Sequence, residues 1–337
     1  MHSPRTPARA ATFVILLLSG CGTQIGNPTG SGLIRVTDNA STLNTLVNAA
    51  FLQTVDGINM GDYAYSRLES RVSTDRNCDA QVGSGISLVD KADSRHSVID
   101  ESAAWYAKSD LTIKRSYQDA WTQNGELLAC DTTARVLRFP HELLEQGTVR
   151  LESQVDEELS RSLFLTEKKE KQELQHNLSF KKTGRRTLEF MNFAEKGSEV
   201  TLVAQLSNEV ESTIALPSET GVESATLQLQ ERFPLEFSVT LDQSKQWTRY
   251  VIPSGRQEFI IPASGEVLRL EFRNVTLSRE GGCVPIGGQL SATVVRPNES
   301  NIRYSMTFQP NSPLIMKRDG GTDSLVLAPF ACVLKER

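Results

Sequence analysis

The sequence predicts a mainly β protein, an antiparallel meander with one short N-terminal helix. Beyond about residue 110, apolar and polar residues alternate, as expected for strands with one sheltered face. Glycine-containing turn signals separate these segments at short intervals, which is typical of hairpins. Neither a Gly-x-Gly-x-x-Gly motif nor an alternation of strands and helices is present. A barrel, a sandwich and a broad curved sheet all remain compatible with this pattern.

The predicted helix covers Ser41–Asp56. Its apolar residues recur at spacings of three and four and form one stripe: Leu43, Leu46, Val47, Ala50, Phe51 and Val55. Ser41 is the expected N-cap and Gly57 the expected end. Asn44, Asn48 and Gln53 form the polar side, which carries no Lys or Arg and therefore does not favour contact with lipid head groups. We expect the helix to pack on a sheet; the alternative is a helix that binds a partner.

Strands and turns account for most of the remaining chain. Alternation within 111–117, 135–139, 148–155, 174–180, 187–193, 199–206, 246–252, 257–261, 267–275, 289–295, 302–308 and 324–327 predicts strands. Both 155–173 and 221–231 also have helical spacings, but we favour strands there. Turns are predicted at Asn124-Gly125, Lys168–Lys171, Lys181–Gly184, Gly197, Ser254-Gly255, Glu280–Gly282 and Asp319–Gly321. Trp105, Tyr106, Trp121, Trp247 and Tyr250 are expected to fill the core.

The N-terminus has the layout of a signal peptide. Arg5 and Arg9 precede the apolar stretch Ala10–Leu18, which is followed by the small residues Ser19 and Gly20. A nine-residue helix is about 14 Å long, roughly half of a hydrocarbon core of about 30 Å, so it is too short for a stable span. Residues 1–20 are therefore predicted to be a signal peptide cleaved between Gly20 and Cys21.

Leu18-Ser19-Gly20-Cys21 resembles the lipobox of bacterial lipoproteins, which signal peptidase II recognises, at each of its four positions. The resemblance implies that Cys21 carries a diacylglyceryl thioether and an acylated amine. Two or more acyl chains hold a protein on a membrane essentially permanently. Gly22 stands where enterobacterial lipoproteins retained in the inner membrane carry Asp. The resemblance thus implies a cell-envelope protein anchored in the outer membrane, on either face.

The mature chain divides into a tether and a β-rich body. Residues 21–32 contain the cysteine and a Gly- and Ser-containing segment that predicts a flexible tether. The body is expected to consist of residues 33–215, with the helix, and residues 216–337. The boundary falls within 200–225, where Pro217, Ser218 and Gly221 lie close together. A single continuous domain over 33–337 is the alternative.

The net charge of the chain limits the classes of partner that it can bind. Residues 1–20 carry two arginines and no acid, so their removal changes the net charge from −5 to about −7. Nucleic acids and anionic lipids require clusters of Lys and Arg, which this acidic chain lacks, so no nucleic acid is expected as a partner. The expected partners are the membrane, through Cys21, and an envelope protein or an apolar ligand.

Four cysteines remain besides Cys21: Cys78, Cys130, Cys283 and Cys332. An even number of cysteines in an exported chain predicts disulfides. Proximity in sequence favours Cys78–Cys130 and Cys283–Cys332 among the three possible pairings. Free thiols are the alternative. Cys283 lies in Gly281–Gly288, a segment with four glycines that is similar to segments of β-rich bacterial lipoproteins of unassigned function and implies no activity.

No catalytic or metal-binding set emerges from the sequence. His96, His141 and His176 are the histidines of the mature chain, but none belongs to a Gly-x-Ser-x-Gly or His-Glu-x-x-His motif. Asp319 and Asp323 flank a glycine turn and could bind calcium, although an ordinary hairpin turn explains them equally well. We therefore expect no catalytic residue, metal or cofactor.

The sequence favours a non-catalytic structural or binding role in the envelope. A carrier that encloses a lipid or another apolar ligand in a β-sheet cavity is one alternative. A hydrolase that uses one of the three histidines is another.

Overall fold

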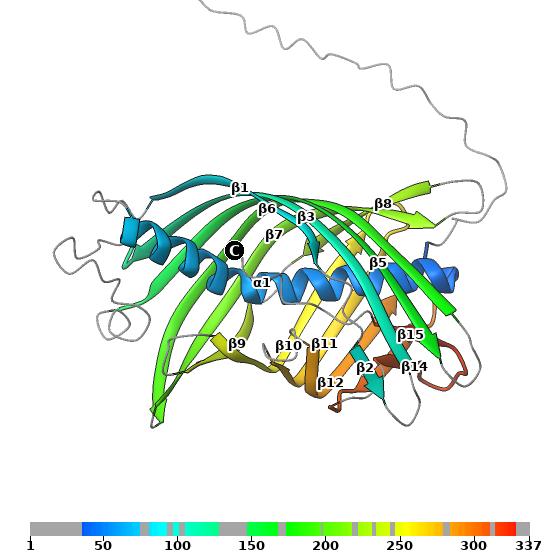
Figure 1. Cartoon of the computed structure of the whole chain (residues 1–337). Helices are drawn as coiled ribbons and strands as arrows, with labels where there is room; N and C mark the ends of the chain where they lie inside the picture. Colours follow the sequence, from blue (N-terminus) through cyan, green and yellow to red (C-terminus); the bar gives the residue numbers. More distant parts are fainter. Residues whose placement is uncertain are drawn as a thin grey trace, which may run out of the picture. The chain divides into compact units, whose positions relative to one another are not determined.

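In the computed structural model, helix α1 (Ala40–Thr74) packs against strands of an antiparallel sheet (Figure 1). The structure describes residues 36–74, 81–92, 97–100, 105–127, 147–167, 173–196, 198–217, 222–230, 234–242, 247–278, 284–310 and 314–327. Residues 35–337 form one compact unit. The signal peptide and tether lie outside the described residues, as do the proposed strand 135–139 and the predicted turn 168–171.

The described part of the sheet has fifteen strands, whose order largely follows the sequence. The continuous path is β1-β3-β5-β6-β7-β8-β10-β11-β12-β13-β14-β15, while β2 and β4 pair with β3, and β9 pairs with β7 and β10. This arrangement confirms the predicted antiparallel meander with one helix. The strands are β1 Gln81–Ala92, β2 Ser97–Asp100, β3 Trp105–Gln123, β4 Glu126–Leu127, β5 Val149–Glu167, β6 Glu173–Lys196, β7 Glu199–Pro217, β8 Val222–Gln230, β9 Leu235–Leu241, β10 Trp247–Ile261, β11 Glu266–Ser278, β12 Val284–Val295, β13 Ile302–Thr307, β14 Ile315–Arg318 and β15 Ser324–Val326.

Strands β8 and β9 occupy one position in the sheet, end to end. Strand β8 pairs with residues 211–217 of β7, and β9 pairs with residues 200–206 of the same strand. Pro234 stands directly before β9 and has no backbone N–H to donate to a ladder. Both the 200–225 stretch and the 221–231 stretch are therefore largely strand, in β7 and β8.

Helix α1 is longer than predicted. Its N-cap is Asn39 instead of Ser41, since Asn39 Oδ1 accepts hydrogen bonds from the backbone N–H of Ser41 at 2.8 Å and of Thr42 at 3.2 Å. Gly57 does not end the helix. It allows close packing instead, because a Cβ there would lie 2.7 Å from Leu206 Cδ2. Glycine at this position therefore allows α1 to lie close to β7, and the helix continues past it.

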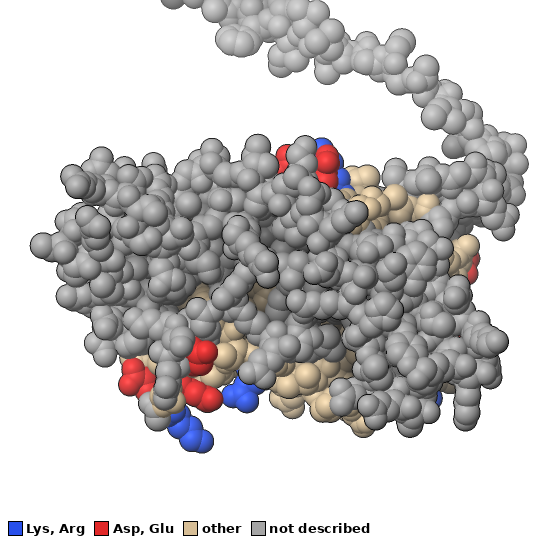
Figure 2. All heavy atoms as spheres, in the orientation of Figure 1, with Lys and Arg blue, Asp and Glu red and all other residues tan. Residues whose placement is uncertain are grey.

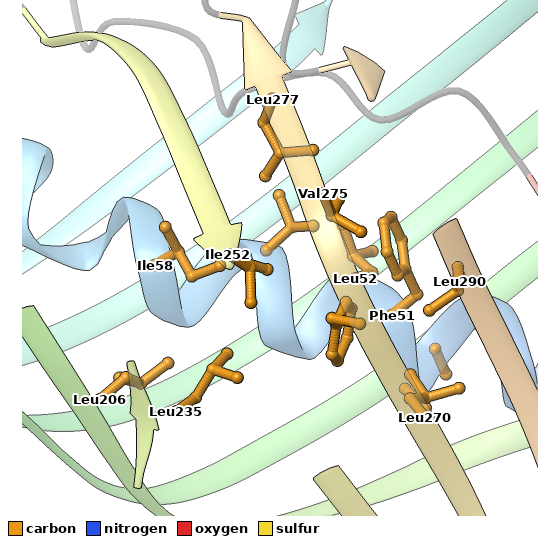
Figure 3. Packing of buried hydrophobic residues seen from close by; sticks show 14 of the residues in the cluster. Phe51, Leu52, Ile58, Leu206, Leu235, Ile252, Leu270, Val275, Leu277 and Leu290 are labelled. Carbon is orange, nitrogen blue, oxygen red and sulfur yellow. The ribbon is translucent and has the colours of Figure 1, made fainter. Parts of the chain in front are cut away.

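Within residues 42–61, α1 is buried around its whole circumference. Every side chain from Thr42 to Gly61 is buried except that of Asn44, which is half-buried. In Figure 1, strands β5–β7 pass over one side of α1 and strands β10–β12 lie on the other. Figure 3 shows the result on the helix: Phe51, Leu52 and Ile58 point into a cluster that residues of several strands complete. The expectation that the helix packs on a sheet is confirmed, and Asn48 and Gln53 of its polar side are buried as well.

That polar side contacts the last strand of the sheet. Asn48 Nδ2 donates to the carbonyl oxygen of Val326 at 2.9 Å, and the N–H of Val326 donates to Asn44 Oδ1 at 2.9 Å. Val326 belongs to β15, which ends the strand order. Two side-chain amides of α1 thus replace a neighbouring strand, and the edge is partly covered, which limits edge-to-edge association.

Two predicted turns are strand. The sequence Lys181–Gly184 lies inside β6, which stays paired with β5 and β7 at Gly184. Ser254-Gly255 lies inside β10, which pairs with β11 through both residues; the chain reverses at 262–265 instead. In both cases the sequence combined glycine with polar residues, but long-range pairing on the neighbouring strands decided the structure.

The Asn124-Gly125 turn is confirmed, with positive φ angles of 51° and 85° between β3 and β4. The turn before Ser324 is confirmed as well, since β14 and β15 pair across it. Strands β11 and β12 flank the turn predicted at 280–282, which itself lies outside the described residues, as does Gly197.

Aromatic side chains form a connected part of the core, as predicted for three of them. Trp121, Trp247 and Tyr250 are each about 1% exposed. The ring of Phe190 lies 6.1 Å from that of Trp121 and 6.1 Å from that of Trp247, in stacked and edge-on geometry respectively. The side chains of Trp105 and Tyr106 are outside the described set.

The first described residues of the body are fixed to residues in the second half of the chain. The 3₁₀ turn η1 (Val36–Asp38) precedes α1, and Arg296 reaches it through Asp38 Oδ1 at 2.6 Å and Thr37 Oγ1 at 2.9 Å. Arg296 Nε also lies 3.3 Å from Glu266 Oε1, and Thr37 donates to the same carboxylate. Thus the residues that follow the predicted tether are held against β11 and the end of β12.

Candidate functional site: a buried polar layer

A polar layer interrupts the apolar inner face of β6 and β7. Five antiparallel pairs face α1 in turn: Phe180–Ile214, Lys182–Ser212, Gly184–Val210, Arg186–Asn208 and Leu188–Leu206. The first and last pairs are apolar. The second and fourth carry two cations, a hydroxyl and an amide. We call Lys182, Arg186, Asn208 and Ser212, with Gln53 and Asp56 of α1, the polar layer.

Asp56 forms ion pairs with both cations of the polar layer. Lys182 Nζ forms an ion pair with Asp56 Oδ2, and Arg186 Nη1 lies 2.6 Å from the same oxygen. The three side chains are exposed by 5% or less. Burial of these charges is costly unless they are paired and hydrogen-bonded, so the two cations and the carboxylate must be considered together.

Gln53, one helical turn before Asp56, completes the contact with the sheet. Its Nε2 donates to Ser212 Oγ, and Arg186 Nη2 donates to its backbone oxygen at 3.3 Å. Arg186 therefore contacts α1 twice, once through a side chain and once through the main chain. Lys182 also lies over the ring of Phe180, with Nζ 5.9 Å from the ring centroid.

Several atoms of the polar layer have no hydrogen-bond partner among the described residues. They are Gln53 Oε1, Arg186 Nε and both side-chain polar atoms of Asn208, all buried. Gln257 lies on the inner side of β10 and is 1% exposed. Its side-chain nitrogen and oxygen also have no hydrogen-bond partner among the described residues. Such groups are rare in protein interiors and mark places where packing alone did not select the residue.

One pattern in the sequence indicates this site. Lys182 and Arg186 are in phase with Leu178, Phe180, Leu188 and Phe190 at every second position, the inner side of β6. A cation in phase with buried residues needs a carboxylate opposite it. Asp56, which the helical pattern predicts only as the last helical residue, supplies that carboxylate.

None of the residues predicted to carry sites falls within the described layer. Gly20, Cys21, Cys78, Cys130, Cys283 and Cys332 lie outside the described residues, as do His96 and His141. His176 belongs to β6, where its backbone is opposite Leu163 of β5. The structure therefore does not test the lipid anchor, the disulfides or a histidine-based hydrolase.

The Asp319–Asp323 turn carries its own cations. Asp323 Oδ2 accepts from Arg318 Nη1 at 2.8 Å, and Asp319 accepts from Ser305 Oγ at 2.7 Å and lies 3.6 Å from Arg303 Nε. Burial and the Asp323 charge both raise the pKa of the nearby Tyr304 phenol, while Arg318 lowers it. Within the described residues, no group of three or more His, Cys, Asp or Glu side chains is arranged to hold a metal ion.

The described surface carries charges of both signs. Lys181 pairs with Glu158, and Arg185 with Glu209, across the outer side of β5–β7. Figure 2 likewise shows acidic and basic side chains close together on the face in view. Such exposed pairs contribute little to stability. None of the described helices combines the length and apolar character needed to cross a bilayer.

Comparisons with protein-family models, with curated proteins and with solved structures found no match.

Proposed function

We propose that the chain is a lipid-anchored protein of the cell envelope, held in the outer membrane through Cys21, with a non-catalytic structural or binding role. The observation that carries this proposal is the Leu18-Ser19-Gly20-Cys21 motif, placed directly after a signal-peptide-like segment. The body contributes support of a second kind, because its first residues are fixed to the sheet through Arg296.

An anchored protein needs a firm connection between its tether and its body. The eleven tether residues after Cys21, 22–32, can extend over at most about 40 Å. The contacts of Thr37 and Asp38 with Arg296 and Glu266 then join that tether to two strands near the C-terminus of the chain. A pull on the tether would act on the sheet instead of unwinding α1 from its first turn.

Replacement of the acylated residue tests the anchor. The Cys21→Ala variant is expected to leave the membrane fraction and to retain its signal peptide, since the peptidase requires the cysteine. Ser31→Ala in the tether is the matched control and is expected to remain in the membrane. Membrane retention of Cys21→Ala with a mass matching cleavage before residue 21 would contradict the proposal.

The membrane can be identified with one further substitution. Gly22→Asp is expected to move the protein to the inner-membrane fraction of an enterobacterial host, following the sorting pattern that the motif implies. If wild type and Gly22→Asp both fractionate with the inner membrane, the outer-membrane assignment is wrong, although the lipid anchor itself is not affected.

A carrier of an apolar or amphiphilic ligand is the second candidate. The observation that favours it is the buried helix: residues 42–61 of α1 form a rod-shaped segment that is buried and contacts several strands of the sheet. An interior of this kind can hold a lipid chain if the helix makes room. Native mass spectrometry after gentle purification tests it: a bound lipid supports a carrier, and its absence after incubation with envelope lipids removes this candidate.

A further inference from the structure

We propose that the polar layer on β6 and β7 binds the carboxylate head group of a single-chain amphiphile, and that Asp56 of α1 occupies this position in the ligand-free protein. The inference rests on the second candidate function, the carrier, and names its ligand class. The helix would then act as an internal substitute for the ligand, and binding would require its central part to move away from β6 and β7.

The chemistry of the layer fits a carboxylate. Lys182 and Arg186 come from the sheet, four residues apart on one side of β6, and both converge on one oxygen of one carboxylate. Arg presents a planar set of donors that matches a carboxylate, and Lys adds a point charge. Because the cations belong to the sheet and the carboxylate to the helix, the cation pair remains in place when the helix moves.

The surroundings of the layer fit an alkyl chain. The pairs Phe180–Ile214 and Leu188–Leu206 border the polar layer on both sides along the strands, and all four side chains are buried. On the helix, Leu52, Val55 and Ile58 lie close in sequence to Asp56 and are buried too. A carboxylate attached to an apolar rod therefore has the same pattern as the segment of α1 that covers the layer.

The present occupant satisfies the layer incompletely. Arg186 Nε, Gln53 Oε1 and both polar atoms of Asn208 lack a hydrogen-bond partner among the described residues. A contact selected only to hold the helix in the sheet would be expected to pair its buried polar atoms or to replace them with apolar groups. Incomplete pairing between α1 and the sheet weakens this contact selectively and favours exchange for a better-fitting group.

Titration of the mature, membrane-extracted protein with laurate, below its micellar concentration, tests the inference. Laurate has the proposed carboxylate and chain, and decanol has a comparable chain without the charge. Asp56→Asn removes the competing charge and keeps the shape of the side chain. We expect the variant to bind laurate at least tenfold more tightly than wild type, with no comparable change for decanol.

Two controls assign the effect to the layer. Asp38→Asn removes an acid from a different ion-paired contact of the body, at Arg296, and is expected to leave laurate binding unchanged. Lys182→Met in the Asp56→Asn background is expected to reverse the gain at least tenfold. Equal laurate affinity of wild type and Asp56→Asn, or an equal gain for decanol, would overturn the inference.

Hydrogen exchange provides a readout that needs no variant. Saturating laurate is expected to increase amide exchange in residues 50–60 of wild-type α1, because the helix must leave the layer; unchanged protection at saturation would also overturn the inference. If laurate and decanol both bind wild type with α1 unmoved, the carrier function stands and the polar layer is not its head-group site. If neither binds wild type or variant, both the carrier and the inference fail, while the Cys21 anchor is tested separately.

Discussion

Gly61→Ala should destabilise the protein although alanine is the better helix former. Gly61 lies inside α1, where a Cβ would stand 2.7 Å from Leu188 Cδ2, 2.9 Å from Trp247 Cη2 and 3.3 Å from Phe190 Cζ. The first two distances are shorter than real Cβ contacts, and all three side chains are exposed by 1% or less. The added methyl group therefore meets the aromatic core directly.

Two opposing terms decide the magnitude. In a helix interior, Ala is favoured over Gly by about 0.8–1.0 kcal/mol. Overpacking of a filled core costs about 1–3 kcal/mol, and the upper part of that range applies here because two neighbours are aromatic rings in contact with each other. We therefore expect Gly61→Ala to lower the free energy of unfolding by about 1–2 kcal/mol.

Urea denaturation, followed by tryptophan fluorescence, measures this difference. Gly287→Ala in β12 is the matched control, because no atom lies within 4 Å of the added Cβ and the φ of Gly287 is not in the left-handed region. The control should be neutral or slightly stabilised. A Gly61→Ala protein as stable as wild type, with an unchanged urea dependence, would show that α1 does not approach β6 and β10 this closely.

Three further outcomes follow from contacts of the helix. Asn48→Ala should cost about 1–3 kcal/mol and promote association through the uncovered β15 edge, because the Val326 carbonyl loses its donor; chemical denaturation and analytical ultracentrifugation check both effects. Arg296→Met should raise amide exchange in residues 36–43 selectively, and uniform exchange changes over the whole chain would contradict that local role. Residues 216–337 expressed alone should stay unfolded, because α1 packs against β10, β11 and β15 and is missing from this fragment. Circular dichroism should show strand content only after residues 33–215 are added, and a fragment that folds alone would refute this dependence.

Much of the β architecture could be predicted because each strand carries its own signal. The alternation of Leu178, Phe180, Leu188 and Phe190 indicates a strand with one buried side, and the structure buries these four. Asn124-Gly125 predicts a hairpin turn because both residues tolerate the positive φ angles that the turn requires. These are local properties of the chain.

The errors share a different origin, since they occur where a distant partner decides the structure. The local pattern of lysines followed by glycine at Lys181–Gly184 predicts an exposed turn that includes Lys182. In the structure it is buried against Asp56, which lies 126 residues earlier. Gly57 is predicted to end the helix because glycine commonly follows a helix. Its role is set by Leu206, on the other side of the interface. A single sequence contains both members of each pair but not their proximity.

The helix illustrates why a polar side need not indicate solvent. Asn44, Asn48, Gln53 and Asp56 would normally face water, and an enclosed helix is normally apolar all round. Here each of these residues meets a polar group that the sheet could not have satisfied alone: the edge of β15 for Asn44 and Asn48, Ser212 for Gln53, and two cations for Asp56. The sheet and the helix therefore specify one another through polar contacts as well as through the apolar core. Since removal of one partner from a buried ion pair typically costs about 3–5 kcal/mol, whereas replacement of all partners by apolar groups is often neutral, retention of the charges points to a requirement other than stability. Binding of a carboxylate at Lys182 and Arg186 would supply that requirement.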